Sequence, residues 1–285
     1  MKDLTKKIQE AVLDMMAKVK FEKDGHTYQR TSDGKWLQGV SSVSSIIPKD
    51  WLSAWGAKEA VKALGYSDYE GDTKLAKEMM EKIVSCETPE EYILLLKEAK
   101  GASARKNKTA LVDGKKGHAW LEEYVLAKIR GTELPKMPTD ALKRPIEQFL
   151  DWEKDNVAQW VLSEARVAYP EKEYAGTLDA MAIMKDGKLA IIDFKFASHI
   201  SEDYYLQTAG YQATFEPYNI KIDQRIIIRL PKTLEIEEWD KKEHKYSKVP
   251  NNIEVCIVGT SYEMDRDVFL NCLPVKRWIN LFKNK

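Results

Sequence analysis

Two acidic residues interrupt otherwise apolar stretches in the middle of the sequence. Asp179 follows Gly-Thr-Leu, and Asp193 is followed by Phe194 and Lys195. A carboxylate in an apolar run costs free energy unless it is paired or holds a cation. Asp193 and Lys195 are two residues apart, so in a strand their side chains share one face. Two carboxylates and an ammonium are the parts that metal-assisted hydrolysis of a phosphate ester needs, because carboxylates bind hard cations and the ammonium stabilises developing negative charge.

The register of the hairpin that carries both aspartates decides whether they meet. A two-residue turn would place Asp179 opposite Phe194 and the two carboxylates on opposite faces. A three-residue loop, 185–187, with Gly187 in the left-handed conformation would instead pair Asp179 with Asp193. Apolar residues lie on both faces in either register, so the pattern leaves both open. We predict the second register, because only it lets both carboxylates hold one metal.

A second group of polar residues precedes the hairpin, in a segment expected to open a helix. His118 and Glu122 are four residues apart, which places them on one helix face. A lone histidine on a helix is more often a hydrogen-bonded core residue than a ligand, but glycines here permit close backbone approach. A basic loop that leads into a helix start is a plausible phosphate seat. The basic residues of this segment are Arg105, Lys106, Lys108, Lys115 and Lys116.

A third group lies on the helix expected after the hairpin. Gln207 and Tyr211 are again four residues apart, and their polar ends could reach a phosphate or a base. Tyr204 and Phe215 share their side of the helix, and we interpret these two as an aromatic core stripe.

The elements that must position these residues follow from hydrophobic periodicity. An amphipathic helix, a β-hairpin with a turn at Ser32-Asp33-Gly34 and a helical region precede residue 101, and an alternation of helices and strands follows it. The mixed-sign run Glu235 to Lys248 is expected to be a solvated loop. The expected elements are helices at 3–19, 113–130, 140–157, 203–216 and from about 265, strands at 160–169, 224–230 and 253–259, and hairpins at 21–43 and 177–195. The sequence therefore predicts an α/β fold with a central mixed sheet flanked by helices, plus a helical and hairpin N-terminal extension.

Length, charge and cysteine content limit the possibilities further. The 285 residues suit one cooperative unit with an accessory region at 1–100 and a core at 101–285. Lys plus Arg and Asp plus Glu are 45 each, so any polyanion site must be local. The sequence has no long apolar run and no secretory signal, which predicts a cytoplasmic protein without a membrane partner.

The motifs, taken in order, resemble the PD-(D/E)XK nuclease superfamily, and within it the RecB-like branch. The group most similar is the mitochondrial genome maintenance exonucleases with their phage and bacterial relatives. The likeness covers about 105–260, and the hairpin around Tyr28 and Gly39-Val-Ser-Ser-Val43 also looks like the lead-in of that group. The residues that carry it are Gly-x-x-x-His-x-x-x-Glu at 114–122, Ser163-Glu164, Gly-Thr-Leu-Asp at 176–179, Asp-Phe-Lys at 193–195 and Gln-x-x-x-Tyr at 207–211.

The resemblance implies a restriction-endonuclease-like core and a role for each matched residue. It makes His118, Asp179, Asp193 and the Phe194 carbonyl metal ligands and Lys195 the catalytic lysine, with both aspartates in the catalytic set. Glu164 and Glu122 are second-tier site residues, and the residues expected to contact DNA are Gln207, Tyr211, Lys115, Lys116 and Arg105. The metal would be one or two Mg²⁺ or Mn²⁺ ions, with the imidazole favouring Mn²⁺.

Two departures from the family pattern matter. Leu178 stands where a proline usually precedes the first acid, although Gly-Thr-Leu-Asp is frequent in this branch. The three cysteines, Cys86, Cys256 and Cys272, are too few for the iron-sulfur cluster of some RecB-like nucleases, so we expect none.

The function implied is metal-dependent exonuclease action on DNA with single strands or free ends, in a bacterial or phage-infected cell. One alternative is a structure-specific or restriction-like endonuclease on the same core. The alternative of another class is an inactive DNA-binding or assembly protein, which should lack an acid or the lysine, and none is missing here.

Overall fold

The computed structural model of the chain describes residues 2–22, 27–68, 73–240 and 245–283. It divides into two compact units. Unit 1 comprises residues 1–47, 116–232 and 252–285, and unit 2 comprises residues 48–115 and 233–251. This grouping differs from the division expected at residue 100, because strand pairing and helix packing join the first 47 residues to the later strands.

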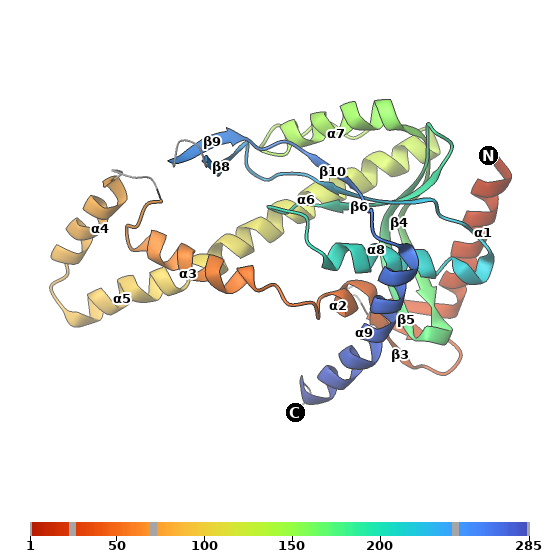
Figure 1. The fold of residues 1–285 in the computed structure, drawn as a ribbon, viewed down its shortest axis with the longest axis horizontal. Coiled ribbons are helices and arrows are strands. Elements are labelled where there is room, and N and C mark those ends of the chain that lie inside the picture. The colour runs from red at the N-terminus through yellow and green to blue at the C-terminus, as the bar shows by residue number, and fades with distance from the viewer. Residues whose placement is uncertain (1, 23–26, 69–72, 241–244, 284–285) are drawn as a thin grey trace. The chain divides into compact units, whose positions relative to one another are not determined.

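Unit 1 contains the central sheet and the helices that cover it (Figure 1). The sheet strands are β1 (Val19–Glu22), β2 (Thr27–Arg30), β3 (Trp36–Gly39), β4 (Val157–Tyr169), β5 (Tyr174–Met184), β6 (Leu189–Lys195), β7 (Gln224–Arg229) and β10 (Glu254–Ile257). The helices are α1 (Lys2–Lys18), α2 (Val40–Ser44), the part of α6 (Ala102–Arg130) that follows residue 115, α7 (Lys143–Asn156), α8 (Asp203–Ala213) and α9 (Tyr262–Lys283), with 3-10 turns at Pro170–Lys172 and Glu216–Tyr218.

The sheet is mixed, which confirms the expected α/β class with a central mixed sheet flanked by helices. Its strand order over the described residues is β1-β2-β3-β5-β6-β7-β10, and β4 pairs with β5 outside this path. The pairs β3–β5 and β6–β7 are parallel, whereas β4–β5, β5–β6 and β7–β10 are antiparallel. Strand β5 therefore pairs with β3, β4 and β6.

Both faces of the sheet are covered by apolar packing, as the apolar residues on both faces of β6 require. Ile191 packs in one cluster with Ile8 of α1 and Phe269 of α9. Its neighbour Ile192 packs in a second cluster with Phe149 of α7. Because successive strand residues point to opposite faces, the two clusters lie on opposite sides of the sheet. A polar side chain in β6 is thus held rigidly, and it meets solvent only toward the end of the strand.

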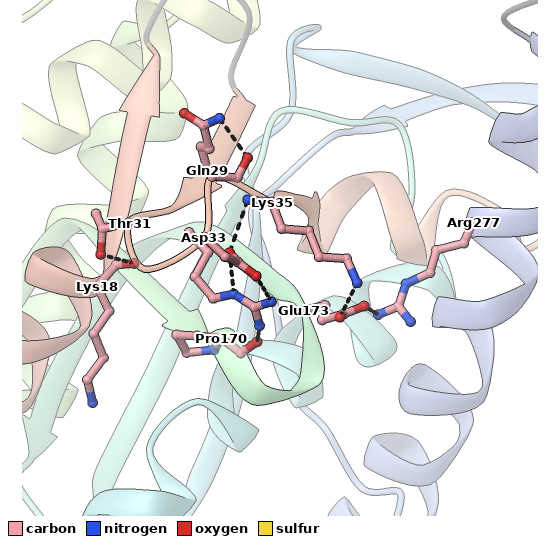
Figure 2. A network of polar contacts seen from close by, with 10 residues as sticks. Lys18, Gln29, Thr31, Asp33, Lys35, Pro170, Glu173 and Arg277 are labelled. Atoms are coloured by element: carbon pink, nitrogen blue, oxygen red, sulfur yellow. Dashed lines mark hydrogen bonds and ion pairs between the residues drawn. The ribbon is translucent and has the colours of Figure 1, made fainter.

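The β2–β3 hairpin is tied to the β4–β5 connection and to α9 by a polar network (Figure 2). Arg30 donates to the Pro170 carbonyl at 2.9 Å. Glu173 forms ion pairs with Lys35 and with Arg277, the second at 2.9 Å. Exposed ion pairs each contribute little free energy, but together these contacts hold three distant parts of the chain in one arrangement.

Unit 2 is mainly helical. It contains α3 (Trp51–Ala63), α4 (Lys74–Val84), α5 (Pro89–Lys100) and the first part of α6, together with the strands β8 (Glu235–Asp240) and β9 (Lys245–Pro250). The expectation of a solvated loop at 235–248 is wrong, because β8 and β9 pair as an antiparallel two-stranded sheet. Ile236 of β8 and Val249 of β9 are opposite each other in that ladder, a pairing that the mixed charge of the sequence obscured.

The other expected elements are present with shifted ends. The first hairpin has its turn at residues 31–33, followed by Gly34 at φ +71, and β1 adds a strand to it. The helix expected from residue 113 begins at Ala102. None of the helices in the described ranges combines the length and apolarity needed to cross a membrane.

Candidate metal centre

The β5–β6 hairpin has the three-residue loop that the sequence predicts. Met184 donates its N–H to the Lys188 carbonyl at 2.8 Å, which leaves residues 185–187 as the loop, and Gly187 has φ +84. The pairs run from Ile183 with Leu189 to Ala180 with Ile192. One further step along this register brings Asp179 opposite Asp193, as expected.

At that step the ladder changes from backbone to side-chain bonding. Asp179 accepts a hydrogen bond from the Phe194 N–H through Oδ2, at 2.8 Å. The bond satisfies that N–H and fixes the Asp179 carboxylate beside the end of β6. The ligand role expected for the Phe194 carbonyl stays a prediction.

Glu164 of β4 is an acid that the structure brings beside Asp179. The pairs on either side, Ser163 with Ala180 and Ala165 with Leu178, place Glu164 across from Asp179 on the neighbouring strand. Glu164 has φ +43, a conformation that costs free energy in a residue with a side chain. Such strain inside a strand re-aims the carboxylate out of the regular pleat, and here the carboxylate comes to lie beside Asp179.

His118 reaches the same point from α6. One ligand atom from each of His118, Glu164 and Asp179 lies within 4.8 Å of the other two, and His118 Nδ1 is 3.9 Å from Asp179 Oδ2. The approach depends on Gly117, because a Cβ there would lie 2.1 Å from Cζ of Phe196. The ring of Phe196 meets the imidazole edge-on with centroids 5.3 Å apart. The glycine thus has the close-approach role that its place in the motif suggested.

Asp193 and Lys195 form a buried ion pair next to this group. Lys195 Nζ is 2.7 Å from Asp193 Oδ2, and the Asp193 side chain has no exposed surface. The contact is close, but neither Asp193 oxygen has a well-directed hydrogen bond within the described chain. A buried carboxylate with unused lone pairs can accept a further positive partner.

Lys195 is held from the α8 side. It donates to Gln207 Oε1 at 3.2 Å, and Gln207 donates from Nε2 to the Tyr211 hydroxyl at 3.1 Å. Tyr204 places its ring 4.9 Å below the Lys195 ammonium. Gln207 and Tyr211 are both buried, and Gln207 holds the lysine; the DNA contact that we expected for these two residues stays a prediction. Tyr204, interpreted from sequence as core, belongs to the lysine's surroundings, whereas Phe215 is in the core as expected.

The pKa values at the centre are perturbed in the directions that crowded, desolvated acids require. Burial, with Asp179 and Glu122 nearby, raises the pKa of Glu164 to about 8. Burial also raises the pKa of Asp193 to about 6, against the opposing effect of Lys195. The pKa of Asp179 is raised by burial, which outweighs the lowering effect of Lys195. The pKa of His118 is lowered to about 4, mainly by burial, so its imidazole is neutral at pH 7.

This set of groups suits a divalent cation. A neutral imidazole and carboxylates are ligands that Mn²⁺ and Mg²⁺ accept, and a cation would relieve the repulsion among the acids. Ligand atoms on opposite sides of such an ion lie about 4 Å apart, close to the separations within the group of His118, Glu164 and Asp179. Glu164 is therefore a candidate metal ligand together with His118 and Asp179. Asp193 is a further candidate, because neither of its carboxylate oxygens has a hydrogen-bond partner among the described residues.

The expected basic phosphate seat is the part of the sequence interpretation that is wrong. Because α6 begins at Ala102, residues 114–117 lie inside a continuous helix and have no free N-terminal amides. Helix-forming residues from 102 onward continue the helix through Gly114, whose cost in a helix is only about 1 kcal/mol. Lys115 and Lys116 are exposed on this helix. Arg105 donates to the Glu98 carbonyl at 2.6 Å.

Glu122 lies one helical turn after His118 and is exposed. Its charge contributes to the raised pKa of Glu164, so Glu122 acts on the centre from the edge.

Comparison of the chain with protein-family models and with curated proteins gives no match. The interpretation of the centre therefore depends on its own geometry and on the order of motifs in the sequence.

Proposed function

We propose that this protein is a divalent-metal-dependent deoxyribonuclease that hydrolyses phosphodiester bonds, acting as an exonuclease on DNA with single strands or free ends. The observation that carries the proposal is the convergence of His118, Glu164 and Asp179 within 4.8 Å, beside the buried pair of Asp193 and Lys195. Buried acids arranged around a neutral imidazole suit a cation, and an ammonium at the edge of such a site suits a phosphate.

Each group has a distinct part in the proposed reaction. His118, Glu164, Asp179 and Asp193 would hold Mg²⁺ or Mn²⁺, which when bound polarises a phosphoryl oxygen and lowers the pKa of water. Lys195 provides fixed positive charge where negative charge develops on the phosphate. Gln207 and Tyr204 keep its ammonium directed at the centre. Hydrolysis then forms a bond from a water oxygen to phosphorus and breaks the bond from phosphorus to a deoxyribose oxygen, which leaves with a proton that the water gives up.

The fold supports a restriction-endonuclease-like core as part of the same proposal. The antiparallel β5–β6 hairpin carries both aspartates, β7 continues the sheet in parallel, and α6 and α8 supply the histidine and the glutamine. The preference for DNA ends comes from the resemblance of the ordered motifs to RecB-like exonucleases. The exposed lysines Lys115 and Lys116 on α6 are candidates for contacts with the DNA backbone.

The test is cleavage of end-labelled single- and double-stranded DNA in Mg²⁺ or Mn²⁺, with chelator as the blank. Asp193→Ala and Lys195→Ala should each reduce the rate by about 100-fold or more, because each removes a charge that acts on the transition state. Asp186→Ala and Lys188→Ala are matched controls: they break an exposed 2.8 Å ion pair in the loop region of the same hairpin. The controls should cleave at the wild-type rate.

Closed circular DNA separates exonuclease from endonuclease action, since an exonuclease leaves it intact. Cleavage of circles at the rate seen for linear DNA would contradict the exonuclease assignment but keep the nuclease. If Asp193→Ala and Lys195→Ala cleave DNA at the wild-type rate, the assignment of these residues to the reaction centre is wrong. Metal-dependent DNA binding without any cleavage would instead indicate a binding protein on this scaffold.

A further inference from the structure

A cavity of about 580 Å³ lies in unit 1 beside the metal centre. Its walls come from the β2–β3 hairpin, α2, the start of β5, α8 and α9. The polar network of Figure 2 fixes part of this wall, because it ties the hairpin to α9. Asn280 of α9 donates to Gln38 of β3 at 3.1 Å, which closes the wall between those two elements. The volume is within the range of about 300–1,000 Å³ typical of small-molecule sites.

The chemistry of the lining is neutral and hydrogen-bonding. Gln38, Ser41, Ser42, Thr177 and Asn280 line the cavity with hydroxyl and amide groups. Within the described part of the chain, the lining includes no carboxylate, lysine, arginine or histidine. A phosphate would need a cation or a cluster of charged donors, and a metal ion would need carboxylate or imidazole ligands. The lining instead suits an uncharged ligand with many hydrogen-bond donors and acceptors.

The cavity adjoins the proposed reaction centre through two side chains. Thr177 lines the cavity and lies two residues before Asp179 in β5. Tyr211 lines the cavity, and its ring packs so closely on Gly176 that a Cβ there would lie 2.7 Å from Cε1. The Tyr211 hydroxyl accepts from Gln207, which in turn holds Lys195. A ligand in the cavity therefore lies next to whatever occupies the centre.

We propose that this cavity binds the base and deoxyribose of the nucleotide whose phosphate lies at the metal centre. The inference rests on the proposed nuclease function, and it adds a nucleoside subsite to the phosphate-binding groups. Hydroxyl and amide groups such as those of the lining bond to base edges and sugar oxygens. The centre supplies charge for the phosphate, and the cavity supplies neutral contacts for the rest of the nucleotide.

Gly39 provides a variant that fills the cavity without straining the chain. It lines the cavity, and its φ of −72 suits any residue. A Cβ at this position would lie 3.7 Å from Cβ of Ser42 and 3.9 Å from Cε2 of Tyr28, which are ordinary contacts. Gly39→Leu therefore blocks the space, whereas Ser42→Ala and Gln38→Ala each remove one polar group. Ser45→Ala is the matched control, because Ser45 is exposed and lies outside the lining.

The first experiment measures binding of the four deoxyribonucleosides to the full chain by NMR, without metal and without cleavage. We expect saturable binding that Gly39→Leu weakens at least about 10-fold and that inorganic phosphate does not compete away. The second measures DNA cleavage kinetics. Ser42→Ala and Gln38→Ala should raise KM about 3- to 10-fold each, the effect of one lost hydrogen bond, with kcat little changed. Ser45→Ala should match the wild type in both experiments, and circular dichroism confirms that each variant is folded.

The two proposals fail in different ways. Suppose that the wild type cleaves no DNA but binds nucleosides, and that Gly39→Leu does not bind them. The nuclease proposal is then wrong, and the nucleoside site stands. If the wild type cleaves DNA, and nucleosides either fail to bind at about 10 mM or bind Gly39→Leu as well as wild type, the subsite is wrong and the nuclease stands.

Discussion

At the scale of single residues, the acids of the centre compete for protons. Glu164, Asp179 and Asp193 each lose hydration, and the charge of Asp179 raises the pKa of both Glu164 and Asp193. Lys195 offsets part of this repulsion for Asp193 at 2.7 Å. With a pKa of about 8, Glu164 therefore holds its proton at pH 7 in the metal-free protein, and a divalent cation that binds this carboxylate must displace it.

We predict that Glu164 destabilises the metal-free protein as pH rises. Its pKa is raised to about 8 from an ordinary 4.5, so the folded state holds the proton more tightly than the unfolded chain. Its stabilising contribution is complete below pH 4.5 and is lost as pH rises toward 8. The measurement is the melting temperature of wild type and of Glu164→Gln in chelator. The difference, variant minus wild type, should increase by at least about 2 °C from pH 5 to pH 8, which is the effect of about 1 kcal/mol for a chain of this size.

The same variant should bind metal more weakly, because the amide cannot supply a charged ligand. We expect Mn²⁺ affinity to fall at least about 10-fold in titration calorimetry at pH 8. Glu123→Gln, an exposed site on α6, is the control and should change neither the pH dependence nor the affinity. Equal Mn²⁺ affinity in wild type and Glu164→Gln would return Glu164 to the second tier.

At the scale of elements, the centre exists because a helix approaches the end of a strand very closely. Gly117 of α6 and Phe196, just beyond β6, are in contact with no room for a Cβ between them. This contact brings His118 within 3.9 Å of Asp179. The position of the imidazole thus depends on the absence of a side chain one residue earlier.

We predict that Gly117→Ala lowers stability and metal affinity together. In an unhindered helix the change would stabilise by about 1 kcal/mol, so a net loss of about 1–3 kcal/mol would identify the clash with Phe196. Urea denaturation and Mn²⁺ titration measure the two effects. Phe196→Leu in the same chain should recover part of the stability, while Gly259→Ala, where a Cβ meets open space, should be near neutral. A Gly117→Ala protein as stable as wild type would show that α6 moves away freely.

The sequence predicted the elements that depend on local rules, and it failed where pairing between distant segments decides. The apolar pattern left two registers open for Asp179 and Asp193, and the requirement that both carboxylates hold one metal chose the one that the three-residue loop ending at Gly187 produces. The central position of Glu164 depends on how β4 pairs with β5 and on a positive φ in a non-glycine residue, which no sequence pattern marks. The charged residues of 235–248 led us to predict a loop where β8 and β9 pair. The phosphate-binding helix start that we inferred from Lys115 and Lys116 does not exist, because α6 already begins at Ala102.

At the scale of the whole molecule, a formal net charge of zero excludes attraction of DNA by overall charge. Any attraction must come from local groups of cations. Lys115 and Lys116 are consecutive and exposed in the middle of α6, two residues before the histidine of the centre. Arg105 is less suited, because its guanidinium is already bonded to the Glu98 carbonyl. The two lysines are therefore the first candidates among the expected backbone contacts.

We predict that replacing Lys115 and Lys116 by alanine weakens DNA binding through loss of counterion release. Each lost phosphate contact should reduce the slope of log K against log salt by about 0.7 for single strands, so the double variant should lose up to about 1.4. Fluorescence anisotropy at several salt concentrations gives the slope, and Mn²⁺ affinity should stay unchanged because neither lysine is a ligand. Lys6→Ala with Lys221→Ala removes two exposed lysines outside α6 and should leave the slope at its wild-type value. If both double variants lower the slope equally, DNA is attracted by dispersed charge and α6 has no special part.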